Sequence, residues 1–233
     1  MYAPRFSITN NILKNIGIIE ASKEVIDHAP LLPYYEKQFR ENALVRTVHY
    51  GTHIEGNELN LSQAEKVLAG QNVVARERDI QEVINYRKAM DFINDKGLMI
   101  NDELIKKLHK ITTNKILPPE KCGEYRKTSV VIKNNQTGQV SFRPPEANAI
   151  LGQIKDLLAF ISGKQNQDIH PVLKSGIVHY ELVRIHPFVD GNGRVGRALS
   201  TLILFVKGYD IRKFFSLEEY FDRNASNYYL ALQ

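Results

Sequence analysis

The spacing of apolar residues predicts helices along most of this 233-residue chain. Between Arg78 and Ile93, the apolar residues Val83, Tyr86 and Met90 recur three or four positions apart, which places them on one face of an amphipathic helix. Prolines and polar stretches separate similar segments elsewhere. The other expected helices are one or two within Thr9–Ile26, then Tyr34–His49, one starting at Leu61, Asn101–Thr112, Ala147–Ser162, His170–Ile185, one opening near Arg194, and Leu217–Gln233. The pattern therefore predicts an all-α protein.

Two of these helices carry more detailed expectations. In the second helix, Phe39, Ala43 and Val45 are expected to face the core. In the third, Ser62 is a candidate N-cap and Glu65 lies three positions later, which is the spacing of a capping box. Both expectations come from the local pattern alone.

One region departs from the helical pattern. Ser129–Ile132 and Gln139–Phe142 are rich in β-branched and aromatic residues, and the polar stretch Lys133–Gly138 separates them. We therefore predict one β-hairpin, which ends at Pro144 and Pro145. The outer edge of such a hairpin exposes unpaired backbone groups that can template an added strand. The residues of the first strand that would offer this edge are Val130, Val131 and Ile132.

Composition narrows the class of protein. With 43% hydrophobic and 24% charged residues, the chain is typical of a soluble globular protein of one domain with room for a small appendage. Its single cysteine, Cys122, excludes an internal disulfide framework and fits a reducing, cytoplasmic location. The N-terminus lacks the pattern of a secretion signal, and no apolar run approaches the roughly 20 residues that span a bilayer.

The charge distribution argues against nucleic-acid binding by this segment. The formal net charge is +5, but lysine and arginine are scattered, without a cationic block or a basic stripe interleaved with aromatic residues. A mildly basic surface suits ATP or an acidic protein partner equally well.

The segment His186–Arg197, with the sequence HPFVDGNGRVGR, concentrates chemically useful groups. Apolar residues at helical spacing follow it, so its glycine turn leads into a buried helix. Free N–H groups and partial positive charge at a helix N-terminus bind anions, and Gly191 and Gly193 let the backbone approach a phosphate closely. Arg194 and Arg197 lie three positions apart and leave the same helix face. The segment therefore predicts a phosphate clamp.

Three residues of this segment have candidate roles beside the clamp. His186 is a candidate general base, because imidazole accepts a proton near neutral pH. Asp190 is a candidate Mg²⁺ ligand, because such a site uses few protein oxygens and is completed by phosphates and water; a helix N-cap is the alternative role. Asn192 is a candidate turn residue or phosphate contact. His179, seven positions before His186, is expected to be a buried hydrogen-bonding residue.

This segment resembles the signature of Fic-domain proteins, His-x-Phe-x-Asp/Glu-Gly-Asn-Gly-Arg-x-x-Arg, at every specified position. The resemblance implies a Fic-type orthogonal helical bundle and a protein adenylyltransferase that moves AMP from ATP to a Ser, Thr or Tyr hydroxyl of a target protein. It makes His186 the general base and Asp190 the ligand of Mg²⁺ at the α- and β-phosphates. It also assigns those phosphates to the amides of Gly191, Asn192 and Gly193, the β-phosphate to Arg194 and the γ-phosphate to Arg197.

The predicted hairpin extends the resemblance. Gly123-x-Tyr125-Arg126, followed by the hairpin and Pro144-Pro145, resembles the flap of Fic proteins. In that family, the flap holds a segment of the target protein by β-augmentation. The resemblance therefore implies that a target protein docks on this hairpin.

A second motif lies upstream. Thr52–Asn57, with the sequence THIEGN, resembles the inhibitory motif Ser/Thr-x-x-x-Glu-Gly/Asn of autoregulated Fic proteins. The resemblance implies that Glu55 pairs with Arg197 and displaces the γ-phosphate, because a carboxylate can occupy the guanidinium site that a phosphate would use. The chain departs from the motif at its first position, where Gly51 stands four residues before Glu55. The alternative is a helix-terminal turn without such a partner.

We therefore expect residues 1–75 to form an N-terminal region that carries the inhibitory helix, and residues 76–233 to form the Fic catalytic core, which many relatives extend further. Doc-type phosphorylation is disfavoured, because those relatives carry Lys where this chain has Gly193. Two alternatives stay open: a bifunctional enzyme in which Glu55 positions a water that removes AMP, and a regulatory or DNA-associated interaction module that retains the motif. The sequence does not determine the target, the nucleotide or the oligomeric state, so a homodimer also stays open.

Overall fold

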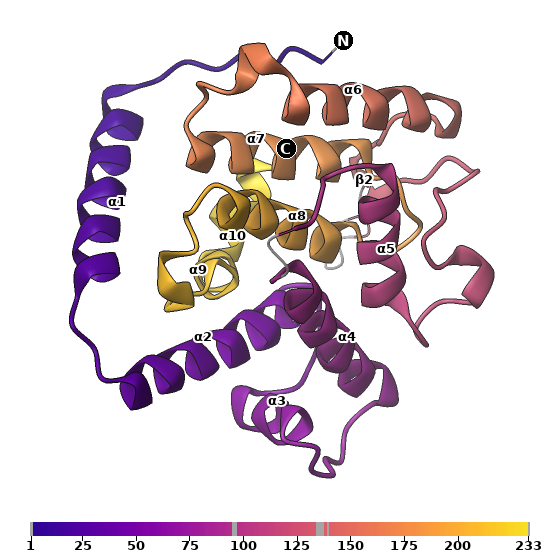
Figure 1. Cartoon of the computed structure of the whole chain (residues 1–233). Helices are drawn as coiled ribbons and strands as arrows, with labels where there is room; N and C mark the ends of the chain where they lie inside the picture. Colours follow the sequence, from indigo (N-terminus) through magenta and orange to yellow (C-terminus); the bar gives the residue numbers. More distant parts are fainter. Residues whose placement is uncertain (1, 95–96, 134–137, 139, 233) are drawn as a thin grey trace.

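Ten α-helices, four short 3₁₀ helices and one two-stranded hairpin make up the part of the chain that this computed structural model describes, residues 2–94, 97–133, 138 and 140–232. The α-helices are α1 (Asn10–His28), α2 (Pro33–His53), α3 (Leu61–Leu68), α4 (Glu77–Ile93), α5 (Asp102–Thr113), α6 (Ile150–Ser162), α7 (Pro171–Ile185), α8 (Asn192–Val206), α9 (Leu217–Arg223) and α10 (Ala225–Ala231) (Figure 1). The strands are β1 (Ile132–Lys133) and β2 (Val140–Phe142), and the 3₁₀ helices are η1 (Pro119–Lys121), η2 (Ala147–Ala149), η3 (Lys164–Asn166) and η4 (Ile211–Lys213). The predicted all-α fold with one β-hairpin is confirmed.

Helix α8 lies in the core of the fold. It packs on α7, and it also contacts α4 and α5. Its side chains at Val195, Ala198, Leu199 and Leu202 have no exposed surface. Helix α5 stands across the direction of α6 and α7, so the helices cross one another instead of forming an aligned bundle (Figure 1). Burial of α8 places the loop that precedes it, and the glycine turn at its start, against the centre of the molecule.

Helix α2 brings the upstream motif to the same place. It packs on α4 and α9, and it also contacts α8. Its C-terminal half contributes the buried residues Thr47, Val48, Gly51 and Thr52. The turn that carries Glu55 therefore lies beside the start of α8, although the two are far apart in the sequence.

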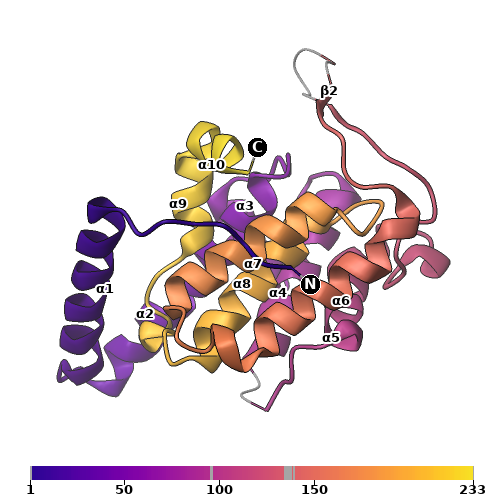
Figure 2. The ribbon, with the colours of Figure 1, turned by 90° about the horizontal axis from the view of Figure 1, so that it is seen from above.

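The hairpin projects away from the helical body (Figure 2). Its strands pair antiparallel, with Ile132 opposite Phe142. Helix α1 lies at the periphery on another side of the molecule and contacts η4 (Figures 1 and 2). Among the described residues, no helix has the length and apolar character needed to cross a membrane.

The first strand of the hairpin is shorter than predicted. Of the four residues expected in it, Ser129–Ile132, only Ile132 lies in β1, whereas Ser129, Val130 and Val131 precede the strand. The physical reason lies in the opposite segment: continuing the register would bring Val130 opposite Pro144, which has no N–H to donate to a ladder. The predicted turn at Lys133–Gly138 falls mostly outside the described residues, as does Gln139 at the start of the predicted second strand.

Other local predictions were also wrong in detail. Helix α3 is capped by Asn60, whose side chain accepts from the N–H of Gln63 while the Gln63 side chain accepts from the N–H of Asn60, so Ser62 is not the cap. The last predicted helix is two helices, because the backbone at Asn224 leaves the helical region (φ −119°, ψ 38°). Phe39 of α2 remains 44% exposed and Val45 is half-buried, whereas Ala43 is buried as predicted.

Candidate functional site

The loop between α7 and α8 has a residue in the left-handed backbone conformation at each end. His186 is the C-cap of α7, with φ +49° and ψ 57°, and Gly191 is the N-cap of α8, with φ +80°. The Asn192 side chain braces the loop, because its Nδ2 donates to the carbonyl oxygen of Phe188 and its Oδ1 accepts from the N–H of the same residue, each at 2.9 Å. The left-handed turn position is therefore Gly191, and Asn192 holds the turn from within the helix.

His186 sits half-buried at the start of this loop. Its Nδ1 lies 3.3 Å from the carbonyl oxygen of Val183. A carbonyl oxygen only accepts, so this contact assigns the ring proton to Nδ1 and leaves Nε2 with a free lone pair. Burial lowers the pKa of His186 below its ordinary value of 6.5. The imidazole is therefore neutral at pH 7 and able to accept a proton.

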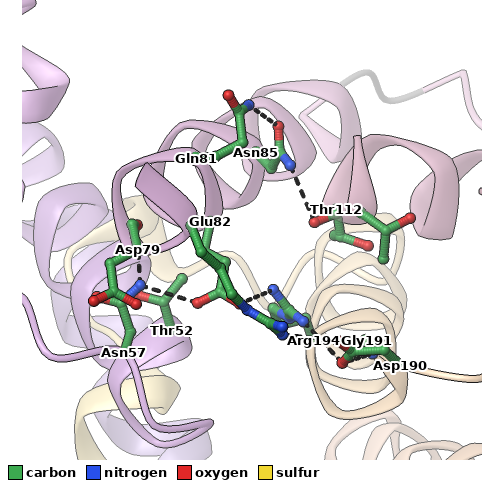
Figure 3. Close-up of polar contacts among 12 residues, drawn as sticks. Thr52, Asn57, Asp79, Gln81, Glu82, Asn85, Thr112, Asp190, Gly191 and Arg194 are labelled. Carbon is green, nitrogen blue, oxygen red and sulfur yellow. Dashed lines mark hydrogen bonds and ion pairs between the residues drawn. The ribbon is translucent and has the colours of Figure 1, made fainter. Parts of the chain in front are cut away.

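Four charged side chains form a closed ring beside the loop. We call Arg78, Glu82, Arg194 and Asp190 the four-charge ring. Figure 3 labels Glu82, Arg194 and Asp190 of this ring. Glu82 Oε1 lies 3.1 Å from Arg78 Nε and 3.1 Å from Arg194 Nη1. Arg78 Nη2 donates to Asp190 Oδ2 at 2.8 Å, and Arg194 Nη2 donates to Asp190 Oδ1 at 3.1 Å. Burial by itself would raise the pKa of Asp190, but Arg194 and Arg78 hold that pKa below its ordinary value, so the carboxylate is ionised.

Arg197 lies on the other side of the helix start and is buried. Its Nη1 forms an ion pair with Glu55 Oε1 at 2.8 Å and donates to the hydroxyl of Tyr228 at 3.1 Å. Its Nη2 donates to the carbonyl oxygen of Gly51 at 2.8 Å. Burial favours the neutral form of this guanidinium, but Tyr228 and Glu55 raise its pKa well above the ordinary value. The upstream motif thus contacts the second arginine of the downstream motif through both a side chain and a backbone carbonyl.

The departure of the inhibitory motif at Gly51 has a steric explanation. A Cβ atom at this position would lie 2.3 Å from Cε1 of Tyr86, a buried residue of α4. Serine or threonine therefore does not fit where α2 crosses α4. At Gly193 the constraint is softer: a Cβ there would lie 2.0 Å from Glu55 Oε1, the end of a flexible side chain, so Glu55 would have to shift. Glycine at position 51 therefore lets α2 approach α4, and glycine at position 193 leaves room for the Glu55 carboxylate beside α8.

His109 of α5 is a site residue that sequence reasoning missed. Its Nδ1 accepts from the N–H of Gly123 at 2.8 Å, so its Nε2 carries the proton and donates to the carbonyl oxygen of Asp190 at 3.0 Å. Its ring stacks on Phe188 with centroids 3.8 Å apart and planes 2° apart. Burial lowers the pKa of His109 to about 4. His109 therefore ties the root of the hairpin to the loop before α8.

Arg126, which belongs to the motif that resembles the flap, also contacts the loop between α7 and α8, and the sequence did not predict this contact. Its Nε donates to the carbonyl oxygen of His186 at 2.8 Å, and its backbone N–H donates to the carbonyl oxygen of Pro187 at 2.9 Å. Its Nη2 donates to the carbonyl oxygen of Pro145 at 2.5 Å. The Arg126 side chain thus links Pro145, where the hairpin ends, to His186, the candidate general base. His179 is buried, with its Nε2 3.1 Å from the Tyr228 hydroxyl, as predicted.

The sequence and the fold place this protein in a known class. Residues 99–204 match the model of the Fic/DOC family, so this part of the chain is a Fic domain. It is 31% identical over 210 residues to protein adenylyltransferase fic-1 of Caenorhabditis elegans, covering 87% of this chain and 39% of that protein. It is 29% identical over 178 residues to protein adenylyltransferase Fic of Drosophila grimshawi, covering 74% of this chain and 35% of that protein. The chain thus spans about two fifths of the length of these curated relatives.

Solved structures of the family share the fold. A crystal structure of a Fic family protein from Desulfovibrio desulfuricans superposes with a TM-score of 0.81 at 29% identity, covering 99% of this chain and 68% of that chain. A fragment of Fic-1 from C. elegans superposes with a TM-score of 0.72 at 25% identity, covering 96% and 67% of the two chains. The helical arrangement around α8 is therefore that of Fic proteins.

Proposed function

We propose that this chain is a protein adenylyltransferase that transfers AMP from ATP to a hydroxyl side chain of a target protein. The observation that carries the proposal is the loop between α7 and α8, which presents a neutral His186 next to the N-terminus of α8 and its two buried arginines. A base beside an anion-binding helix end is the arrangement that attack of a hydroxyl on the α-phosphorus of a nucleoside triphosphate requires. The curated relatives that match most of this chain carry the name protein adenylyltransferase.

In the proposed reaction, the target hydroxyl oxygen attacks the α-phosphorus of ATP, and His186 Nε2 takes the hydroxyl proton. The bond from the α-phosphorus to the bridging oxygen breaks, and pyrophosphate leaves. The backbone N–H groups at Gly191, Asn192 and Gly193 hold the α- and β-phosphates, while Arg194 and Arg197 receive the β- and γ-phosphates. The chain contributes orientation and charge stabilisation, as in phosphoryl transfer generally.

Asp190 fits a Mg²⁺ site that is completed by the nucleotide. Among the described residues no group of three or more His, Cys, Asp or Glu side chains could hold a metal ion, so Asp190 would be a single protein ligand. One ionised carboxylate together with phosphate oxygens and water is a donor set that suits Mg²⁺. Held there, Mg²⁺ would neutralise charge on the leaving pyrophosphate. Arg78, which donates to Asp190 Oδ2, would release that oxygen to the ion.

The hairpin supports docking of a target segment by β-augmentation. It projects beyond the helical body (Figure 2), and Val131 and Val140 are each 42% exposed. Exposed strand edges recognise extended peptides through backbone hydrogen bonds, and the side-chain pockets add specificity. The contacts of Arg126 with His186 and Pro145 would keep a peptide on the hairpin in register with the candidate base.

We further propose that Glu55 inhibits the resting protein. Its ion pair with Arg197 occupies the guanidinium that would receive the γ-phosphate. Tyr229 adds a hydrogen bond from its hydroxyl to the carbonyl oxygen of Ile54 at 2.6 Å, which fixes the turn before Glu55. ATP would then bind in a pose that does not lead to transfer until Glu55 moves.

The test uses ATP labelled on either the α- or the γ-phosphate. Purified Glu55→Gly protein is incubated with each nucleotide and a lysate, and the labelled bands are compared with those of the Glu55→Gly, His186→Ala double variant. Label from the α-phosphate alone, dependent on His186, supports transfer of AMP. Label from the γ-phosphate would show phosphorylation instead, and no label from either would favour an interaction module that retains the motif.

A further inference from the structure

Glu82 of α4 contacts three different parts of the site (Figure 3). Its Oε1 lies 3.1 Å from Arg194 Nη1 on α8 and 3.1 Å from Arg78 Nε on its own helix. Its Oε2 accepts from Asn57 Nδ2, in the turn after α2, at 3.0 Å. The side chain is only 6% exposed, so this carboxylate is buried among its partners.

The buried positive charge of Arg194 is balanced in part by the carboxylate of Glu82. The Arg194 side chain is 3% exposed, and Nη2 is the atom with a hydrogen bond, which it donates to Asp190. Nε and Nη1 are buried and without a hydrogen bond in the described structure, although Nη1 faces Glu82 at ion-pair distance. A buried cation without a partner is strongly unfavourable. The Glu82 carboxylate therefore holds the inner side of this guanidinium, while Asp190 holds the outer one.

The same carboxylate reaches the turn that carries Glu55. Asn57 is buried, and its Nδ2 donates both to Glu82 and to the carbonyl oxygen of Asp79, each at 3.0 Å. Its Oδ1 accepts from the N–H of Leu59 at 3.1 Å. These contacts attach the turn after Glu55 to α4. The inhibitory turn and Arg194 are therefore both held by the same buried residue, Glu82.

We propose that Glu82 is a positioning residue that holds Arg194 in the orientation that receives the β-phosphate and, through Asn57, anchors the inhibitory turn. The proposal rests on the proposed function of Arg194 as a phosphate ligand. It follows that replacing the carboxylate with an amide weakens the grip of Arg194 on a β-phosphate. A glutamine has a single side-chain oxygen, so it cannot face Arg194 and accept from Asn57 at the same time.

The test compares the affinities of ADP and AMP, because only ADP has the β-phosphate. The reference protein is Glu55→Gly, which frees Arg197, and titration calorimetry is carried out in buffer with Mg²⁺. Adding Glu82→Gln should weaken ADP binding about tenfold or more, the size of a lost hydrogen bond to a charged group, and change AMP binding less than about twofold. Glu77→Gln, at an exposed position five residues earlier on α4, is the matched control and should leave both affinities unchanged.

Asn57→Ala separates the two roles of Glu82. In the reference protein, it should leave the preference for ADP over AMP unchanged, because it does not contact Arg194. In the chain with Glu55 present, it should raise transfer of labelled AMP, because the inhibitory turn loses its anchor. If Glu82→Gln does not fold, as judged by circular dichroism, Glu82→Asp keeps the charge but withdraws it by one methylene. It should reduce the preference for ADP.

Three outcomes would overturn the proposal. An unchanged preference for ADP in Glu82→Gln would show that Arg194 is oriented without it, and equal weakening of ADP and AMP would show a merely structural role. Tighter ADP binding would show that Glu82 competes with the phosphate. A reference protein that binds neither nucleotide would instead contradict the proposed function itself, and with it any role of Glu82 in phosphate binding.

Discussion

The carboxylate of Glu55 lies 2.8 Å from the guanidinium of Arg197, a side chain with no exposed surface. Glu55 itself is 32% exposed, so water reaches one side of the pair. Breaking this pair therefore costs more than breaking a surface salt bridge, but Glu55 can still move away from Arg197 toward solvent. This combination suits an inhibitory contact that a nucleotide or a partner displaces.

Glu55→Gly should raise transfer of AMP about 10- to 100-fold, because it removes a charge-assisted contact of the size that buried hydrogen bonds to charged groups show. Incorporation of α-labelled ATP into the protein itself or into a target measures the change. Glu58→Gly is the matched control, because Glu58 is an exposed residue of the same segment whose partner is Arg76. Equal rates in wild type and Glu55→Gly would contradict autoinhibition.

Gly51→Ala should destabilise the protein by about 1–3 kcal/mol, the usual cost of forcing an extra methyl group into a packed core. The new Cβ would meet the ring of Tyr86 and push the end of α2 from α4. Urea unfolding measures the loss. Gly152→Ala is the control, because no atom lies within 4 Å of its Cβ position on α6, and alanine there should stabilise by about 0.5–1 kcal/mol.

The same Gly51→Ala variant should also have higher basal transfer than wild type, because the carbonyl oxygen of Gly51 accepts a hydrogen bond from Arg197 and Gly51 lies one turn before Glu55. A serine at this position, which matches the family motif better, should act in the same direction. A Gly51→Ser protein that is as stable and as inactive as wild type would show that α2 adjusts to the added atom.

His186→Ala should reduce transfer by about 10²–10⁴-fold, the usual contribution of a general base. ADP affinity should change little, because His186 is proposed to act on the target hydroxyl and not on the phosphates. Transfer is assayed with labelled ATP and affinity by calorimetry. His28→Ala, at an exposed histidine of α1, is the control. Near-normal transfer by His186→Ala would remove this residue from the mechanism.

Asp190→Asn should raise the Mg²⁺ concentration required for half-maximal transfer, because an amide is a weaker ligand than a carboxylate for this hard cation. Titration of Mg²⁺ into the protein with ADP should show the same weakening without any turnover. Asp168→Asn, an exposed position before α7, should leave both curves unchanged. Full activity of the wild type in excess EDTA would exclude the metal.

His109 should make stability depend on pH. Its pKa is lowered to about 4 in the folded protein, against an ordinary value of 6.5, so the unfolded chain binds a proton that the folded protein does not. The stabilisation is complete above pH 6.5 and is lost as the pH falls toward 4. His109→Gln should reduce the slope of unfolding free energy against pH in this window by up to about 1.4 kcal/mol per pH unit, measured by urea unfolding. Parallel profiles for the two proteins would contradict this role.

The sequence by itself determined the features that are local. His186, Asp190, Gly191, Arg194 and Arg197 lie within one turn and the helix after it, so their proximity follows from chain geometry alone. Amphipathic spacing likewise located α4 and α5, because the apolar stripe of a helix is a property of consecutive residues. Where several local solutions compete, as between Ser62 and Asn60 for the cap of α3, the pattern selected the wrong one.

Only the tertiary structure decided which distant residues complete the site. Glu82 contacts Arg194 because α4 packs on α8. His109 contacts Asp190, 81 positions later in the chain, because α5 packs on α8. The glycine at position 51, a departure from the motif in the sequence, is required by the ring of Tyr86, which leaves no room for a Cβ atom. Such contacts depend on where the packing of complete helices places each side chain, and no spacing within one segment contains that information.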